Sequence, residues 1–438
     1  MRIHLGIDDT DSPSGGCTTR IATDLVLSLL SKGVAFVDYP NLIRLNPNVP
    51  WKTRGNAAVC IRMETGLAAQ SILESALDVI ERTCEFDEPG TDPAVAVLEG
   101  EVPTRVREFS EDALVRILDP EEAISTAQSV GATAIACRTT RGIVGALAAI
   151  GSVLTGDHTY ELIAYRSREF IGKPRLVDRD EVLQMDRETR GSTYNNVDPE
   201  TGRILLTPHG ADPILCGVRG ESPDAVRNAF QMLQIREPID AWMIFRTNQG
   251  TDAHLVRTLA VSGLRDNCAV IVDGRVQEKP HTIQGGHVIF RLRDETGSVH
   301  CAAYEPTGKF RHVVRMLQSE DMVRVFGGVR PPSKTTPRTI NLEKLEVLEL
   351  ARHPILRNPV CPTCGKRMKS AGKLQGFRCR RCGNHESSKA QVVSDRSLQA
   401  GVFLPPPRSH RHLTKPYVRY GRERSEAFVP SSSNWHYP

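Results

Sequence analysis

Four cysteines near the C-terminal end of the chain have the spacing of a metal site. Cys361 and Cys364 form one Cys-x-x-Cys pair, and Cys379 and Cys382 form a second pair after a gap of 14 residues. Two such turns can place four thiolates at the corners of a tetrahedron, the geometry in which Zn²⁺ binds sulfur. Because all four positions are sulfur, no coordination position is open for a substrate. The spacing predicts a zinc ribbon with a structural Zn²⁺.

Three carboxylates stand within four positions near the N-terminus, at Asp8, Asp9 and Asp11. They repel one another unless a cation lies among them, and hard oxygen ligands suit Mg²⁺ bound to nucleotide phosphates. The glycines that follow let backbone N–H groups approach an anion, and Thr18 opens the next helix, where a phosphate is favoured and a hydroxyl can accept a phosphoryl group. No Gly-Lys-Ser/Thr occurs here, so this is not a Walker loop. The alternative is an Asp-rich structural turn with a threonine as helix N-cap.

A loop rich in proline and asparagine, 40–56, carries the basic residues Arg44, Lys52 and Arg54. Its prolines restrict an otherwise mobile backbone, so the three side chains could clamp phosphates beside the carboxylates. Solvated basic residues on a surface loop are the alternative. Taken together, the acidic turn and the basic loop indicate two halves of a site for ATP and Mg²⁺.

Two later loops, 207–213 and 247–254, are polar, contain glycine and follow expected strands. Each has an aspartate and a histidine, the pairs being His209 with Asp212 and Asp252 with His254. An aspartate could hold a cationic amine and a histidine could deprotonate it. Ordinary turn chemistry with satisfied side chains is the alternative. A basic turn at 138–142 is equally consistent with phosphate binding and with helix capping.

These motifs need elements that bring them together. Residues 2–7 have the pattern of a strand that ends at the acidic turn, and 19–30 have apolar residues at helical spacing. Alternating strands and helices continue to about 154, which indicates an α/β body. A strand, strand, helix, strand pattern between 203 and 246 is typical of a split β-α-β unit. From about 270 the hairpins have the length of a small OB barrel.

The charge of the chain is unevenly distributed. The net charge is +4, yet residues 351–438 hold 17 Lys and Arg against 4 Asp and Glu. A basic C-terminal part on an acidic body indicates contact with a polyanion, because phosphate contacts release counterions irrespective of sequence. A solvated basic tail is the alternative.

The composition is that of a folded protein rather than a membrane or disordered one. Hydrophobic residues make up 39% and charged residues 25%, close to the globular average. The polar cluster at 6–11 leaves no place for a signal peptide, and even the apolar run 142–154 is too short to span a membrane. Seven cysteines are scattered singly, which does not suggest a disulfide framework. We therefore expect a cytoplasmic protein without a membrane partner.

The motifs together resemble one family, the tRNA-Ile 2-agmatinylcytidine synthetases of archaea. The resemblance covers residues 1 to about 385 and leaves out the basic tail. The matching segments are Gly6 to Asp11 with Cys17 to Thr19, Arg44 to Pro47 with Lys52 to Asn56, Pro208 to Gly210, Thr247 to Asp252, the OB-like stretch and the four cysteines.

This resemblance implies a multidomain α+β protein with a kinase-like α/β catalytic domain, a ferredoxin-like domain, an OB-fold β-barrel and a zinc ribbon, in that order. We expect these units at 1–195, 196–268, 269–350 and 351–395, followed by an extended basic tail at 396–438. These boundaries are predictions from the sequence pattern and the family resemblance.

The resemblance also implies the activity. Family members consume ATP, yielding AMP and phosphate, to activate the C2 oxygen of the wobble cytidine in an isoleucine tRNA with anticodon CAU, and agmatine then displaces it. Thr18 is the expected phosphoryl acceptor, with Asp8, Asp9 and Asp11 as ligands of ATP and Mg²⁺ and the three basic residues of loop 40–56 as phosphate contacts. The expected agmatine ligands are His209, Asp212 and Asp252.

Two other function classes compete with this enzyme. The first is a non-catalytic protein that binds single-stranded nucleic acid through its OB fold and zinc ribbon. The second is a small-molecule kinase that carries nucleic-acid modules. The paired acidic and basic motifs argue against the first, and the large share of the chain given to the C-terminal modules argues against the second.

Overall fold

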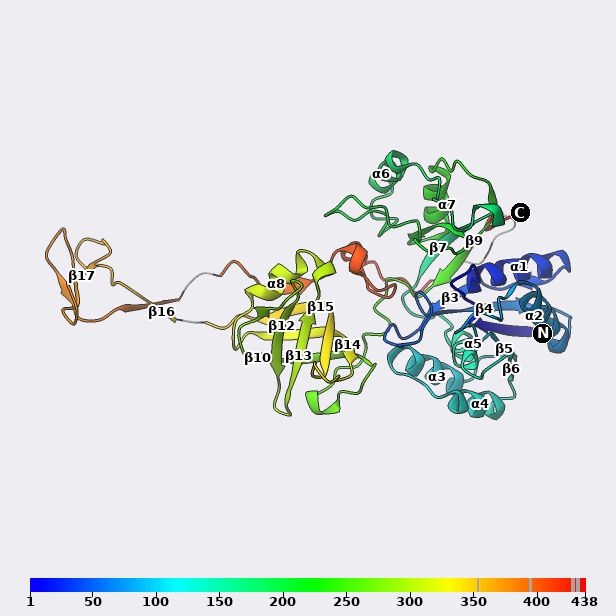
Figure 1. Cartoon of the computed structure of the whole chain (residues 1–438), viewed down its shortest axis with the longest axis horizontal. Helices are drawn as coiled ribbons and strands as arrows, with labels where there is room; N and C mark the ends of the chain where they lie inside the picture. Colours follow the sequence, from blue (N-terminus) through cyan, green and yellow to red (C-terminus); the bar gives the residue numbers. More distant parts are fainter. Residues whose placement is uncertain (353, 394–395, 427–429, 431–433) are drawn as a thin grey trace.

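The computed structural model describes residues 1–352, 354–393, 396–426, 430 and 434–438. It arranges them as a mixed α/β body, a β-barrel and a terminal ribbon that follow one another in a line (Figure 1). The predicted fold class is confirmed.

The body is built on one sheet to which two parts of the chain contribute. Its strands are β1 (Arg2–Asp8), β3 (Asn41–Arg44), β4 (Ala57–Glu64), β5 (Ala94–Glu99), β6 (Thr133–Ala136), β7 (Thr159–Arg166), β8 (Ile214–Gly220) and β9 (Ile239–Thr247). Their order is β6-β5-β1-β4-β3-β9-β7-β8, with β2 (Ala35–Phe36) beside β4. The two parts join where β3 and β9 run parallel, with Leu42 opposite Thr247. The loops that follow these two strands therefore lie together.

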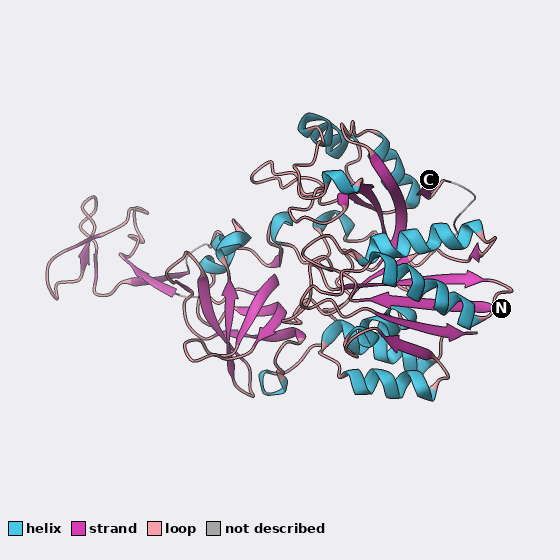
Figure 2. Cartoon of the chain, turned by 45° about the vertical axis from the view of Figure 1, so that its right-hand side comes forward, coloured by secondary structure: helices cyan, strands magenta, loops and turns pink. Residues whose placement is uncertain are grey.

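Helices cover both faces of this sheet (Figure 2). One face packs against α1 (Thr18–Ser31), α2 (Ala69–Thr83), α6 (Arg179–Glu188) and α7 (Pro223–Gln231), and the other against α3 (Thr104–Val115), α4 (Pro120–Ser129) and α5 (Gly142–Gly151). The glycines and alanines of α5 let it lie close to β1: a Cβ on Gly6 would stand 2.0 Å from the carbonyl oxygen of Ala146. This close packing fixes the strand whose end carries the acidic turn.

Two elements differ from the sequence pattern. The strand expected at 203–207 is absent from the described strands, and only an isolated bridge joins Val197 and Ile204. The strand β7, which the range 1–195 assigns to the catalytic domain, lies between β9 and β8. All eight of its residues are buried, so the backbone N–H and C=O groups along both of its edges must pair with neighbouring strands.

The barrel has the closed pairing of an OB fold. Its strands are β10 (Ala269–Val276), β11 (His281–Thr282), β12 (Val288–Arg293), β13 (Ser298–Ala303), β14 (Met322–Arg330) and β15 (Thr339–Glu349), with the helix α8 (Phe310–Met316). The order β10-β14-β15-β13-β12 returns to β10 through the β10–β12 pair, so no long edge is left open.

The ribbon lies at the far end of the molecule from the body (Figure 1). Its stalk is the antiparallel pair β16 (Pro354–Arg357) and β20 (Ala390–Val393), and its tip has the short strands β17 (Lys369–Ser370), β18 (Phe377–Arg378) and β19 (His385–Glu386). The small core at the tip consists of Cys361, Met368, Phe377 and Cys379.

The tail after the ribbon returns to the body. It contains β21 (Gly401–Phe403) on β15, the 3₁₀ turns η4 (Pro407–Ser409) and η5 (Tyr417–Arg419), and β22 (His436–Tyr437) on β9. Several of its basic residues pair with the rest of the protein, as in Arg396 with Asp321 and Arg408 with Asp198. The basic surplus of the sequence is therefore partly used inside the molecule. No helix in the described parts is long and apolar enough to cross a membrane.

Candidate active site

The acidic turn begins where β1 ends in the middle of the sheet. Asp8 is the last residue of β1, and Asp9 has a φ of 57°, in the left-handed region that non-glycine residues seldom adopt. The carbonyl oxygen of Asp9 accepts a hydrogen bond from the N–H of Asp92 at 3.1 Å, which holds this conformation. Backbone strain of this kind is held in place by its surroundings and gathers at functional sites.

Asp8 lies in an environment that disfavours its charge. Burial, and then the charges of Asp9 and Asp11, raise the pKa of Asp8 well above its ordinary value. The carboxylate rests against α5 at Gly145, where an added Cβ would stand 1.8 Å from Asp8 Oδ2. A bound cation would relieve this repulsion.

Asp9 shares a basic partner with a second carboxylate. The Nη2 atom of Arg141 lies 2.8 Å from both Asp9 Oδ2 and Asp92 Oδ2. Burial raises the pKa of Asp9 to about 6 although Arg141 acts in the opposite direction. The basic turn at 138–142, which the sequence left open between phosphate binding and capping, therefore contributes Arg141 to this centre.

Asp11 positions Thr18, the first residue of α1. Its Oδ1 atom accepts hydrogen bonds from the N–H of Thr18 at 2.8 Å and from Thr18 Oγ1 at 3.2 Å. The hydroxyl of Thr10 donates to Thr18 Oγ1 at 3.0 Å. The N-cap residue, Cys17, makes no side-chain cap. Asp11, which precedes the helix in the chain, thus caps α1 with its carboxylate. The alternative interpretation required a threonine as the N-cap residue, and that residue is Cys17.

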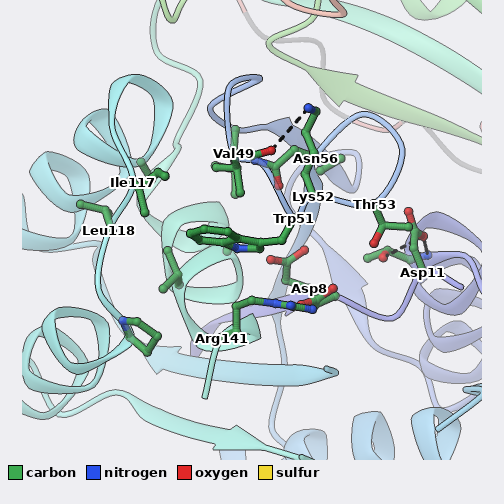
Figure 3. Close-up of a pocket in the computed structure, with 18 of the residues that line it drawn as sticks. Asp8, Asp11, Val49, Trp51, Lys52, Thr53, Asn56, Ile117, Leu118 and Arg141 are labelled. Atoms are coloured by element: carbon green, nitrogen blue, oxygen red, sulfur yellow. Dashed lines mark hydrogen bonds and ion pairs between the residues drawn. The ribbon is translucent and has the colours of Figure 1, made fainter. Parts of the chain in front are cut away.

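A cavity of about 290 Å³ lies over these groups, with the indole of Trp51 extending across it (Figure 3). Its charged lining residues are the three aspartates, Arg116, Arg141 and Lys52, whose Nζ turns to the carbonyl oxygen of Val49 at 3.5 Å. The opposite wall is mainly apolar and consists of Leu45, Val49, Trp51, Ile117, Leu118, Pro120 and Val144. A polar floor beside an apolar, aromatic wall suits a ligand that has phosphates at one end and a planar base at the other.

The three basic residues of loop 40–56 all line one small cavity of about 190 Å³, but they differ in the larger cavity that each of them borders. Lys52 lines this first cavity, and burial, followed by the charge of Arg411, lowers its pKa. Arg54 donates to the carbonyl oxygens of Ser12 at 3.2 Å and Gly16 at 2.9 Å. Arg44 points to Glu161, with Nη2 3.8 Å from Oε2.

A second cavity of about 420 Å³ adjoins the first. Asp11, Thr18 and Ala57 line both. The second also contains the predicted residues Arg44, Arg54, His209 and Asp212, together with Glu161, Arg219 and His412, which the sequence did not single out. Thr18 therefore faces two adjoining spaces.

The structure does not bring Asp252 into either cavity. Its carboxylate pairs with Lys344 of β15 and accepts from the N–H of Lys415 at 2.8 Å. His254 Nε2 likewise lies 2.9 Å from Glu343 Oε2. The C-terminal half of loop 247–254 thus contacts the barrel and the tail, because β9 ends on the side of the body that faces them.

The zinc site fits its predicted ligands. The Sγ atoms of Cys361 and Cys382 are 3.2 Å apart, those of Cys364 and Cys379 3.4 Å, and those of Cys364 and Cys382 3.8 Å. Ligands ~2.3 Å from a tetrahedral Zn²⁺ would be about 3.8 Å apart. The four cysteines form the only group of three or more possible ligands within 4.8 Å of one another in the described chain.

The carboxylates of Asp8, Asp9 and Asp11 are more widely separated than the four cysteine sulfur atoms of the zinc site. Mg²⁺ is commonly held by one or two carboxylates, with phosphate oxygens and waters completing its octahedron. Hard oxygen donors in the cavity that also holds Lys52 and Arg141 have the right chemistry for that arrangement.

The fold and the cavities define a class of multidomain protein. Its α/β body holds two adjoining cavities lined by carboxylates and basic side chains, and it is followed by an OB barrel and a zinc ribbon, which are modules typical of nucleic-acid-binding proteins. Four family models match the chain: TiaS TCKD domain over residues 4–71, TiaS FLD domain over 140–254, OB-fold nucleic acid binding domain over 270–348 and TiaS C-terminal zinc ribbon domain over 358–398.

Individual relatives match over nearly the whole chain. The tRNA 2-agmatinylcytidine synthetase TiaS of Staphylothermus marinus is 40% identical over 99% of this chain and 98% of its own. A crystal structure of TiaS in complex with an isoleucine tRNA and ATP is 37% identical, covers 96% and 97% of the two chains and has a TM-score of 0.84. A complex of TiaS with the tRNA, AMPCPP and agmatine is 35% identical with the same coverage and a TM-score of 0.82. The chain belongs to the TiaS family.

Proposed function

We propose that this protein is the ATP-dependent ligase that joins agmatine to C2 of the wobble cytidine of an isoleucine tRNA with anticodon CAU. ATP is converted to AMP and phosphate in the process. The C2 oxygen of cytidine is a poor leaving group as oxide. Phosphorylation of this oxygen makes a phosphate ester, which an amine can displace. Agmatine then replaces it to give 2-agmatinylcytidine, which pairs with adenine and allows AUA decoding.

In this proposal ATP binds in the first cavity. Asp8, Asp9 and Asp11 hold Mg²⁺, which would neutralise charge on the phosphates. Lys52 and Arg141 contact the phosphates, and the base lies along the apolar wall beside Trp51, which is 51% exposed. The charged side and the apolar wall of this one cavity support the assignment.

The observation that carries the proposal is the position of Thr18 between two cavities. Thr18 lines both spaces, and hydrogen bonds with Asp11 and Thr10 orient its hydroxyl. A residue placed in this way can accept a phosphoryl group on one side while the tRNA base and the amine occupy the other. Arg44 and Arg54, which line the second space, are then phosphate contacts on the tRNA side.

Agmatine and the cytidine share the second cavity in this proposal. Asp212 and His209 lie on its wall and remain candidate ligands of the cationic substrate, although Asp212 Oδ1 already lies 3.2 Å from Arg175 Nη2. Asp252 is left out, because Lys344 and the tail already occupy its carboxylate.

The barrel and the ribbon bind the tRNA in this proposal, since single-stranded and folded RNA are recognised by OB folds and by basic surfaces. The protein would work in the cytoplasm, where its tRNA substrate is found.

A reconstitution with purified protein, ATP, agmatine and the tRNA tests the proposal. The tRNA should gain the mass of one agmatine less water on a single nucleotide, and Thr18→Val should lose at least about 100-fold in rate, as expected when a positioned reacting group is removed. Unchanged activity of Thr18→Val would remove the acceptor role of Thr18. No mass gain with wild-type protein would refute the ligase.

A second candidate function is non-catalytic binding of single-stranded nucleic acid. The OB barrel and the basic ribbon are the observations that favour it. It predicts tight, salt-sensitive oligonucleotide binding without any ATP turnover, and therefore gives the opposite result in the same reconstitution.

A further inference from the structure

The tail brings a histidine, His412, to the second cavity. Two hydrogen bonds from the loop after β9 hold its backbone. The N–H of Gly250 donates to the carbonyl oxygen of His412 at 2.9 Å, and the N–H of Asp252 donates to the carbonyl oxygen of Leu413 at 2.7 Å. The side chain lines the cavity that Thr18 and Asp11 also line. Although protein atoms surround the ring, His412 keeps an exposed surface, so it is accessible to a molecule in this space.

Neighbouring side chains determine which ring nitrogen of His412 carries a proton. The Nε2 amide group of Gln249 donates to the carboxylate of Glu161, which can only accept, so Gln249 Oε1 must face the other way. That oxygen lies 3.1 Å from His412 Nδ1. Because an amide oxygen only accepts, Nδ1 must be the donor, and the lone pair of the neutral ring is on Nε2.

The absence of a side chain at Gly55 lets the His412 ring and Arg44 pack closely against loop 40–56 at the edge of the second cavity. A Cβ added to Gly55 would stand 2.6 Å from His412 Nε2 and 2.6 Å from Arg44 Nη1. Within the described parts of the chain, the hydrogen bond of the His412 ring is made by Nδ1, and no residue donates to Nε2. The lone pair is therefore available to a substrate.

The charges around His412 keep its ring neutral. Arg44 of β3, then desolvation by the surrounding protein, then Arg219 of β8 and Arg411 of the tail lower the pKa of His412 well below its ordinary value. The carboxylate that faces this group, Glu161 of β7, acts through Gln249 and is itself paired with Arg219, whose Nε lies 2.9 Å from Oε1. The ring is therefore neutral at physiological pH, and Nε2 keeps its lone pair in the resting protein.

We propose, on the basis of the ligase function above, that His412 is a catalytic residue that takes the proton from the attacking amine nitrogen. The amine enters neutral, and its nitrogen becomes acidic as the C2–N bond forms. One N–H proton moves to His412 Nε2 while the C2–O bond breaks and the oxygen leaves with its electron pair as phosphate. Because Arg44 disfavours the imidazolium, the proton then passes on to the departing phosphate or to water.

The test separates activation from amine transfer. Labelled γ-phosphate from ATP reports phosphorylation of Thr18 or of the tRNA, and labelled agmatine reports transfer. We expect His412→Ala to keep phosphorylation within about twofold of wild type and to lose about 100-fold or more in transfer, the usual contribution of a general base. Added imidazole should restore part of the transfer, and the residual rate should rise with pH.

Two further variants distinguish chemistry from positioning. His412→Asn retains a donor for Gln249 but has no basic nitrogen, so it should be as slow in transfer as His412→Ala; recovery of transfer in His412→Asn would overturn the proposal. His436→Ala, a histidine of the same tail on β22, should behave like wild type. Equal loss of both half-reactions in His412→Ala, or no loss, would also overturn it. Absence of both half-reactions in the wild type would refute the proposed ligase instead.

Discussion

At the scale of single residues, the three aspartates of the N-terminal turn differ in what already occupies them. Asp11 is engaged by Thr18 and Arg54, and Asp9 is engaged by Arg141. Asp8 accepts a hydrogen bond from the backbone N–H of Asp9, and no described side chain donates to it. Asp8 is therefore the carboxylate with the most capacity left for a cation.

Asp8→Asn should stabilise the free protein and abolish its activity. The pKa of Asp8 is higher in the folded protein than in the unfolded chain. The free energy of unfolding therefore falls as pH rises from the unfolded-state pKa through the folded-state pKa, and the wild type is less stable at neutral pH than at acidic pH. Removing this carboxylate should raise Tm at about pH 7.5 by a few degrees, the shift that about 1 kcal/mol produces in a domain of this size. The gain should disappear at about pH 4. Thermal unfolding at both pH values checks this, and a lower Tm of the variant at the higher pH would contradict it.

At the scale of elements, the close packing of α5 on β1 positions the acidic turn. The predicted strand at 2–7 and the helix at 19–30 are confirmed, because local apolar periodicity specifies both. The sequence pattern did not reveal that the small residues of α5 serve the same site. Their spacing is that of a buried helix, and only the packing shows that Gly145 borders Asp8.

Gly145→Ala should displace Asp8 and lower activity by about 100-fold or more, since misplacement of a reacting group by about 1 Å costs that much. The free protein should remain folded, with a loss of about 1–3 kcal/mol from overpacking. Ligase rates and urea unfolding measure the two effects. Gly66→Ala is the matched control, because nothing lies within 4 Å of an added Cβ there; equal activities of the two variants would contradict the role of Gly145.

At the scale of the whole molecule, the tail connects the barrel to the body and completes the second cavity. Its central contact is Arg419, whose side chain is fully buried between Asp157 and Glu221. The Nη2 atom lies 2.8 Å from Asp157 Oδ1, and Nε lies 2.7 Å from Glu221 Oε1. This pairing explains how a strongly basic segment can be part of the folded protein.

Arg419→Ala should destabilise the folded protein by about 3–5 kcal/mol, because it leaves the buried carboxylate of Glu221 without its cation, whereas the half-buried Asp157 keeps Lys415. Agmatine transfer should fall more than phosphorylation, since the tail would no longer hold the second cavity in place. Urea unfolding and the two labelled half-reactions check this. Arg424→Ala removes an exposed basic side chain of the same tail and should leave both unchanged.

Removal of zinc should affect tRNA binding without affecting phosphorylation of Thr18. The ribbon lies far from the α/β body (Figure 1), whose residues line most of both cavities, and the small core of the ribbon depends on the metal. A chelator should weaken tRNA binding at least about tenfold and reduce the slope of log affinity against log salt, because basic contacts to phosphates are lost. Phosphorylation should stay within about twofold of the zinc-loaded protein, since the metal site takes no part in that step. A parallel loss of Thr18 labelling would contradict this separation.

The sequence by itself determined the modules and their family. The Cys-x-x-Cys pairs, the acidic strand end and the hairpin pattern are local, and local spacing is sufficient for a zinc ribbon, a strand-turn-helix and an OB fold to be predicted. The predicted catalytic and binding residues remain predictions to be tested by the experiments above.

Only the tertiary structure decided which residues meet. It placed Lys52 in the first cavity and Arg44 and Arg54 in the second, directed Asp252 to the barrel, and brought His412 from the tail to the cavity that Thr18 lines. These groupings depend on the β3–β9 pair and on the return path of the tail, which join segments hundreds of residues apart. Contacts at that separation leave no periodic trace in the sequence, because they arise from packing between elements and not from the pattern within any one of them.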